Sequence, residues 1–250
     1  PQIHEQIFSG KQDAEVKSTR KKLTVFFSDI VGFTDISDEL ESEEMTNLLN
    51  FYLNEMSQIA LKFGGTIDKY IGDALMIFFG DPESEGPEKD ARKCVEMALE
   101  MQKLMNELKG HWGKHYSLKK DLQIRIGINT GFCTVGNFGS LERLDYTAIG
   151  STVNLASRLE GLAGPGAILI SEDTHSLVEN LFNFETPKEV EVKGFLRKIK
   201  CFKLNQVDML KDDVLHINGK GFEIKINKHL IDHRVIEDLK KELDQVKGTN

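Results

Sequence analysis

The feature that most constrains the fold is a helix-period apolar pattern enclosed by two strand-like segments. Apolar residues recur every three or four positions from Glu43 to Phe63, which predicts an amphipathic helix capped by Gly64 and Gly65. Before it, "KLTVFFSD" reads as a strand rich in Val and Phe. After it, "TIDKYIGDALMIFFG" holds two apolar runs around Gly72 and Asp73, which predicts a β-hairpin with these two residues at its tip.

The next segments continue the alternation of strands and helices. A second helix is expected over 91–108, and "LQIRIGINTGFCTVGNFGS" is predicted as a strand pair that turns at 129–131. A further helix is expected in "STVNLASRLEGLA", with Ser151 or Thr152 as N-cap, followed by strands in "GAILIS", around "VEVKGF" and in "KIKCFKL". This order predicts an α+β fold: a ferredoxin-like βαββαβ, palm-type antiparallel sheet with helices on one face, plus a C-terminal extension.

The pattern predicts three parts of the chain. Residues 1–20 are polar and are expected to be a connector from an upstream domain, and 21–204 form the main domain. Residues 205–250 are expected to add a hairpin about an Asn-Gly turn and a charged helix, to which we assign no role.

Composition excludes several classes of function. The net charge is −8 and the basic residues are scattered, so no stripe exists to bind nucleic acid. Three cysteines far apart, with no CxxC pair, favour buried thiols in a reducing compartment over disulfides or structural zinc. No apolar run reaches the roughly 20 residues of a membrane span, so we expect a cytoplasmic segment without membrane contact. Because the chain starts with Pro, an upstream sensor or membrane tether is expected in a longer protein.

Two carboxylates stand where strand-like runs end, Asp29 after "TVFFS" and Asp73 in the hairpin turn. If these strands are neighbours, both acids emerge at one sheet edge. Mg²⁺ takes one or two carboxylates plus substrate phosphates, and the loop after Asp29 holds Gly32, whose backbone a phosphate can approach closely. Each acid alone is more often structural, because Asp is common in caps and turns.

Further candidates are polar residues on the predicted helix and strand. Asn154 and Arg158 lie four apart and hence on one helix face, where they suit a charged phosphoryl transition state. Arg125, within "IRIGI", needs either a buried acidic partner or an anionic ligand. His111 and His115 have no third ligand nearby and are expected at the surface.

Four motifs in order, "FSDIVGFT", "DKYIGDALM", "IRIGINTG" and "TAIGSTVNLASR", resemble the catalytic domain of class III nucleotidyl cyclases, over about Leu23 to Leu204. The resemblance implies a homodimer with two active sites, each assembled from both subunits, and two Mg²⁺ ions per site, with Mn²⁺ as a substitute. It implies these roles: metal binding by Asp29, Asp73 and the carbonyl of Ile30; phosphate contact by Phe33 and Thr34; triphosphate binding by Arg125 and Lys193; purine selection by Lys69 and Thr147; ribose orientation and transition-state stabilisation by Asn154 and Arg158.

The purine pair favours ATP as substrate. Adenine offers an N1 acceptor and an N6 donor, which suit the Lys69 ammonium and an accepting group at Thr147. We therefore expect an adenylate cyclase that forms 3′,5′-cyclic AMP and pyrophosphate. The alternatives are a guanylate cyclase, a catalytically weak nucleotide-sensing cyclase homologue, a diguanylate cyclase, whose Gly-Gly-Asp/Glu-Glu-Phe turn is replaced here by "IGDAL", and an unrelated Mg²⁺-dependent phosphohydrolase.

Overall fold

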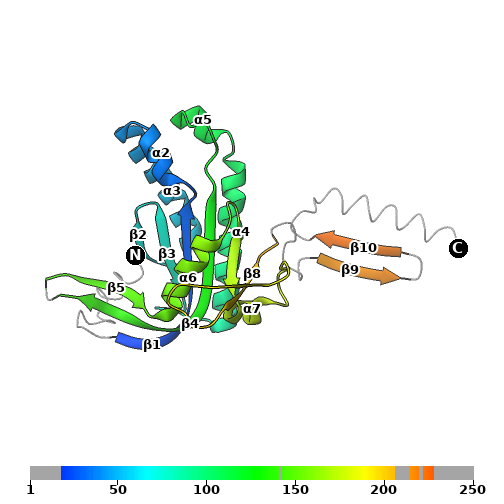
Figure 1. The fold of residues 1–250 in the computed structure, drawn as a ribbon. Coiled ribbons are helices and arrows are strands. Elements are labelled where there is room, and N and C mark those ends of the chain that lie inside the picture. Colours follow the sequence, from blue (N-terminus) through cyan, green and yellow to red (C-terminus); the bar gives the residue numbers. More distant parts are fainter. Residues whose placement is uncertain (1–17, 141, 206–213, 220–221, 228–250) are drawn as a thin grey trace. The chain divides into compact units, whose positions relative to one another are not determined.

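The computed structural model describes residues 18–140, 142–205, 214–219 and 222–227. The chain divides into two compact units, one of residues 1–179 and 184–204 and one of 180–183 and 205–250. The first unit contains, in order, β1 (Ser18–Ile30), α2 (Phe33–Glu39), α3 (Ser42–Lys62), β2 (Thr66–Ile71), β3 (Ala74–Phe79), α4 (Pro87–Glu107), α5 (His111–Tyr116), β4 (Ile124–Gly139), β5 (Leu144–Ile149), α6 (Ser151–Leu162), β6 (Ile168–Ser171), α7 (Glu172–Val178), β7 (Lys188–Val190) and β8 (Ile199–Lys203) (Figure 1).

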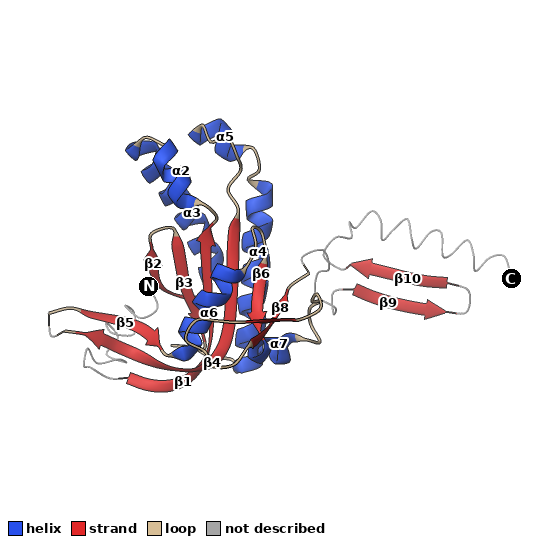
Figure 2. Cartoon of the chain, viewed as in Figure 1, coloured by secondary structure: helices blue, strands red, loops and turns tan. Residues whose placement is uncertain are grey.

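The first unit is built on an eight-stranded sheet in the order β2-β3-β1-β4-β6-β8-β7, with β5 paired to β4. Its pairs are antiparallel except β4–β6, which is parallel. The predicted α+β class is confirmed, and the sheet is mixed rather than wholly antiparallel. Figure 2 shows α3 and α4 behind the sheet and α6 in front of it, so helices cover both faces instead of the one face expected.

Strand β4 differs from its prediction. It is one strand of 16 residues and not a hairpin, and it pairs with β1 along all of β1. The residues expected to turn are buried instead: Asn129 Nδ2 donates to Thr152 O at 2.9 Å, and Thr130 Oγ1 lies 2.9 Å from Thr24 Oγ1. The Asn129 amide nitrogen and the Thr130 hydroxyl thus find hydrogen-bond partners inside the fold, which favours a buried strand over an exposed turn.

Close contact between α6 and the sheet depends on glycine. A Cβ built on Gly127 would lie 2.1 Å from Glu160 N, and one on Gly131 would lie 2.6 Å from Thr152 Oγ1. Gly127 therefore lets the backbone of α6 lie directly on β4, and Gly131 leaves room for the Thr152 side chain. On this face Ala156 joins a core cluster with residues of β1, β3 and β4.

The amphipathic helix is confirmed as α3, which buries Leu48, Tyr52, Met56, Ile59 and Ala60. The β2–β3 hairpin is also confirmed, with a two-residue loop in which Gly72 has the left-handed φ of 64° that favours glycine. Helix α2 was not expected, and none of its residues is buried, so it carries no apolar periodicity. Helix α6 begins at Ser151, with Gly150 as N-cap rather than Ser151 or Thr152.

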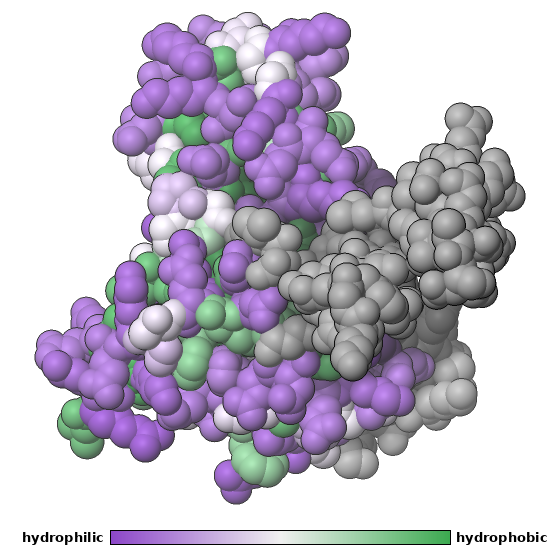
Figure 3. All heavy atoms as spheres, turned by 90° about the vertical axis from the view of Figure 1, so that its right-hand side faces the viewer, coloured by the Kyte–Doolittle hydropathy of each residue, from purple (hydrophilic) through white to green (hydrophobic). Residues whose placement is uncertain are grey.

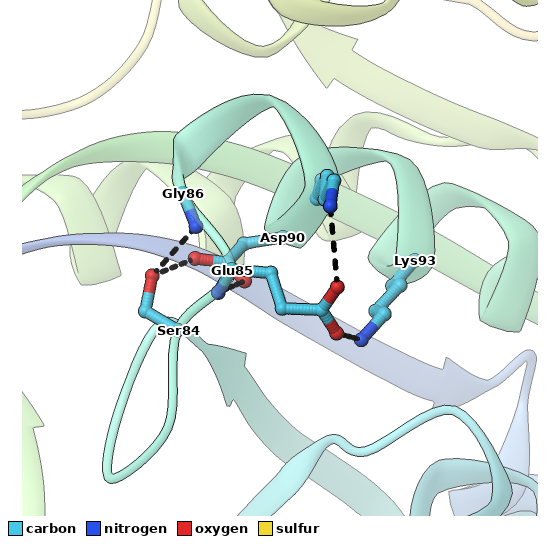
Figure 4. A network of polar contacts seen from close by, with 6 residues as sticks. Ser84, Glu85, Gly86, Asp90 and Lys93 are labelled. Carbon is cyan, nitrogen blue, oxygen red and sulfur yellow. Dashed lines mark hydrogen bonds and ion pairs between the residues drawn. The ribbon is translucent and has the colours of Figure 1, made fainter.

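The start of α4 is fixed by a polar network (Figure 4). The buried Asp90 accepts hydrogen bonds from Ser84 Oγ at 2.6 Å and from Glu85 N at 3.2 Å, and Gly86 N donates to Ser84 Oγ. Lys93 forms an ion pair with Glu85. These bonds satisfy the backbone N–H groups of Glu85 and Gly86, which precede α4. They therefore fix the start of α4 against the preceding loop.

The second unit contains a hairpin of β9 (Val214–Gly219) and β10 (Phe222–Asn227) within its described part. Gly219 pairs with Phe222, so Asn218 and Gly219 belong to the strand and the predicted Asn-Gly turn is wrong in position. The charged helix expected in the tail, and nearly all of the connector expected at 1–20, lie outside the described residues. Ser18, Thr19 and Arg20 are described and belong to β1, not to a connector.

None of the helices in the described ranges is both long and apolar enough to cross a membrane. The face in Figure 3 is mostly hydrophilic, with hydrophobic residues in small separate areas. The three cysteines are free and buried, as expected.

Candidate active site

Two carboxylates meet where β1 ends beside the β2–β3 turn. Because β1 pairs with β3, Asp29 near the end of β1 comes next to Asp73 in the turn. Ile30 N donates to Asp73 Oδ2 at 3.0 Å. Burial, a hydrogen bond to Asp29 and the Asp29 charge raise the pKa of Asp73 to about 7. The two acids thus form a pair that resists carrying two negative charges.

The pair fits a hard divalent cation, because a positive ion offsets both the burial and the Asp29 charge that raise the pKa of Asp73. No cluster of three or more His, Cys, Asp or Glu side chains suited to a metal occurs in the described ranges. Two carboxylates are nevertheless the number that Mg²⁺ takes when substrate phosphates and water complete its shell.

Arg125 has acidic partners, which is one of the two alternatives expected from its apolar neighbours on the strand. It stands opposite Asp29 in the β1–β4 register, and its Nη2 lies 2.7 Å from Asp29 Oδ2. Its Nε lies 2.6 Å from Glu160 Oε1. Although burial lowers the pKa of Arg125, the hydrogen bond to Asp29 and the charge of Glu160 outweigh it and raise the pKa. Burial raises the pKa of Glu160, more than Arg125 lowers it.

A fully buried tyrosine lies behind this group. Tyr52 of α3 is fully buried, and burial, followed by the charges of Asp73 and Asp29, raises its pKa. Tyr52 therefore stays neutral. Its buried ring lowers the local dielectric constant near the carboxylates, which strengthens the electrostatic repulsion between them.

A second group forms at the edge strand β2. Asp68 Oδ2 accepts hydrogen bonds from Thr147 Oγ1 at 2.6 Å and from Ala148 N at 3.1 Å. Asp68 Oδ1 lies 3.3 Å from Lys69 Nζ. The structure thus brings Lys69 and Thr147, both predicted site residues, to one carboxylate.

The other predicted residues have no hydrogen bond or ion pair to these two groups within the described part of the chain. Asn154 and Arg158 are exposed on one face of α6, as predicted, and neither side chain has a hydrogen bond or ion pair within the described residues. Lys193 lies in the loop between β7 and β8. Phe33 and Thr34 open α2 after Gly32, which has a φ of 71°. No hydrogen bond or ion pair in the described part joins Asp29 or Asp73 to Lys69, Thr147, Asn154 or Arg158.

The histidines are partly at the surface. His115 is exposed as expected, but His111 is half-buried and stacks on Phe51 with ring centroids 5.0 Å apart. Burial, followed by the charges of His115 and Lys114, lowers the pKa of His111.

Sequence reasoning missed Asp68 and Glu160. A signal existed for Glu160, since it follows Leu155, Ala156 and Leu159 on the buried face of α6, where an unpaired acid is costly. For Asp68 the only signal was its place beside Lys69, because its bonds to β5 depend on tertiary structure.

Comparisons with known proteins agree on one family. A family model described as the adenylate and guanylate cyclase catalytic domain matches residues 15–206. An adenylate cyclase from Anabaena cylindrica is 36% identical over 204 residues, which is 78% of this chain and 39% of that protein. This chain thus spans less than half of that relative.

Solved structures support the same fold. The crystal structure of the adenylyl cyclase CyaB from P. aeruginosa is 54% identical, with a TM-score of 0.73 over 76% of this chain and 96% of that one. The guanylyl cyclase Cya2 is 33% identical, with a TM-score of 0.70 over 75% of this chain and 93% of that one.

Proposed function

Because this chain belongs to the adenylate and guanylate cyclase catalytic-domain family, we propose that it is an adenylate cyclase that converts ATP to 3′,5′-cyclic AMP and pyrophosphate. The observation that carries the proposal is the joining of Lys69 and Thr147 at Asp68. An ammonium donor beside a hydroxyl that gives its proton to a carboxylate presents one donor and one acceptor. Adenine offers the matching N1 acceptor and N6 donor.

The homodimer belongs to the same proposal. Within the described residues of one chain, no hydrogen bond or ion pair joins the acidic pair, the purine pair and the exposed α6 face, which supports a site that two chains complete. Exposed apolar side chains support this reading, since four of them stand on the strands of the purine pair, Tyr70 and Ile71 on β2 and Leu144 and Ile149 on β5, and Phe132 stands on the neighbouring strand β4. Burial of such residues favours association.

Each side chain then has a role in the reaction. The ribose 3′-oxygen forms a bond to the α-phosphorus, and the bond from the α-phosphorus to the departing pyrophosphate oxygen breaks. Asp29, Asp73 and the Ile30 carbonyl would hold two Mg²⁺ ions, for which Mn²⁺ would substitute. The chemistry these ions supply is activation of the 3′-hydroxyl and neutralisation of the triphosphate charge. The 3′-hydroxyl proton passes to water or to substrate.

The remaining groups orient the nucleotide and stabilise charge. Asn154 orients the ribose, and Arg158 stabilises charge that develops on the α-phosphate. Lys193 and Arg125 hold the pyrophosphate, because the two ion pairs of Arg125 do not use all the donors of its guanidinium. The backbone at Phe33 and Thr34 contacts phosphate oxygens.

Product analysis tests the activity. The purified chain with ATP and Mg²⁺ or Mn²⁺ is expected to yield cyclic AMP and pyrophosphate, separated by chromatography. ADP and phosphate as the only products would refute the proposal, and a preference for GTP would refute the choice of base.

Complementation tests the shared site. Chains with Asp73→Ala and Arg158→Ala are each expected to be inactive, and their mixture is expected to regain about a quarter of the wild-type activity, because half of the dimers are mixed and each then holds one intact site. Mixed dimers that form without activity would show that the site is not shared.

A further inference from the structure

We propose that Asp68 is a positioning residue that fixes the donor and acceptor polarity of the purine pair and thereby excludes 6-oxopurine nucleotides. This inference rests on the proposed function, which places Lys69 and Thr147 against the base. Asp68 itself does not touch the substrate in this scheme, and it acts through Thr147 and Lys69.

A β-bulge aims the Asp68 side chain. Thr66 and Ile67 pair with Phe78 and Ile77 of β3, and the register shifts before Lys69, so Asp68 has no partner on β3. A bulged residue turns its side chain away from the regular alternation. The Asp68 side chain is 0% exposed and reaches β5, which pairs with β4 and lies near β2 (Figure 1).

The Thr147 hydroxyl donates its proton to the carboxylate of Asp68. Ala148 N is a fixed donor to Asp68 Oδ2, and Thr147 Oγ1 lies 2.6 Å from the same oxygen. The other acceptor within reach of Thr147, Ala148 O, is 3.5 Å away. A hydroxyl has one proton and a carboxylate only accepts, so Thr147 donates to Asp68 and offers lone pairs alone to a ligand.

This polarity discriminates at position 6 of a purine. The amino group of adenine donates a hydrogen bond to the lone pairs of Thr147. The keto oxygen of guanine or hypoxanthine instead faces another acceptor, and a buried pair of acceptors without a proton is unfavourable. On the other side, Asp68 Oδ1 forms an ion pair with Lys69 Nζ at 3.3 Å, and the donors of this ammonium suit the N1 acceptor of adenine.

The test compares ATP with inosine triphosphate, because hypoxanthine differs from adenine only at N1 and position 6. The quantity measured is the ratio of kcat/KM for the two nucleotides in the full chain. Asp68→Ala frees the Thr147 proton, so we expect the ratio to fall about tenfold or more. Asp68→Asn keeps an oxygen for Ala148 N and Thr147 Oγ1, so its ratio is expected to stay within about threefold of the wild type.

Two further variants distinguish a positioning role of Asp68 from a general structural role. Thr147→Val added to Asp68→Ala is expected to cause no further fall in the ratio, since Asp68 acts through that hydroxyl. Asp81→Asn is the matched control, because Asp81 is also buried and accepts a hydrogen bond from Tyr146 of β5. This control is expected to lose stability and to keep the ratio.

If the Asp68→Ala chain keeps the wild-type ratio of kcat/KM for ATP and inosine triphosphate, the inference about Asp68 is overturned, and the proposal of an adenylate cyclase is not affected. A wild-type chain that forms no cyclic nucleotide overturns both. If Asp68→Ala does not fold, the Asp68→Asn chain decides the matter. This chain lacks the negative charge that faces Lys69, so its KM for ATP is expected to rise about two- to tenfold. An unchanged KM would overturn the inference.

Discussion

Replacing Asp73 with Asn is expected to stabilise the protein without metal, and only above a certain pH. The folded pKa of Asp73 is about 7, against 3.8 for an unperturbed Asp. Between these values the folded state binds more protons than the unfolded state, so stability falls as pH rises from about 4 to 7. Asn carries no proton to lose, and its oxygen can still accept from Ile30 N.

The magnitude follows from the pKa difference. At about 1.4 kcal/mol per pKa unit the ceiling is roughly 4 kcal/mol. Since the side chain is only half-buried, solvent screening reduces this to about 1–2 kcal/mol. The advantage of the Asn chain should be near zero at pH 4, grow through pH 6 and level off above pH 7.

Urea unfolding in EDTA, followed by circular dichroism and by the fluorescence of the buried Trp112, measures this advantage. Asp38→Asn, an exposed carboxylate on α2, is the control and should show no such trend. Added Mg²⁺ should stabilise the wild type and not the Asn chain, because a ligand of the folded state raises its stability. An advantage that is equal at pH 4 and pH 8 would refute the argument that Asp29 and burial raise the Asp73 pKa.

Further predictions concern α6, the sheet and the thiols. Glu160→Gln weakens one of two ion pairs that hold Arg125, so kcat with ATP should fall about tenfold; unchanged kinetics would show that Asp29 alone positions Arg125. Gly127→Ala should destabilise the fold by about 3 kcal/mol or more in thermal unfolding, because its Cβ would meet the backbone of α6, and a loss below about 1 kcal/mol would contradict this close approach. The three buried cysteines should react with a thiol reagent only on unfolding, whereas rapid labelling of the native chain would show that they are accessible.

Local patterns predicted the elements whose stability depends on local features. Helix α3 has an apolar stripe, and the β2–β3 hairpin has Gly72 at its turn, so both were predicted near their observed bounds. Strand β4 was misread because Asn129 and Thr130 favour turns in isolation, whereas their partners in the fold come from α6, β1 and α7. Those partners are distant in the sequence, so no window around β4 reveals them.

Some residues of the candidate site could likewise be predicted from the local sequence, and others could not. Asp29 and Asp73 could be found because each stands at the end of a strand, and Arg125 because a charge among apolar residues needs a partner. Asp68 could not, because a bulge brings it to its partners, and for Glu160 the sequence shows only its place on the buried face of α6 and not its partner on β4.

Because β4 is one continuous strand of 16 residues, we expect it not to tolerate the insertion or deletion of a single residue. Side chains alternate between faces along a strand, so inserting or deleting one residue between Arg125 and Gly136 would exchange the two faces for the rest of the strand. Arg125 would keep its place opposite Asp29, while the β4 positions that pair with β5 near Thr147 would turn over. The four residues between β4 and β5, 140–143, form the nearest joint that can absorb an insertion, so length variation is expected there and not within β4.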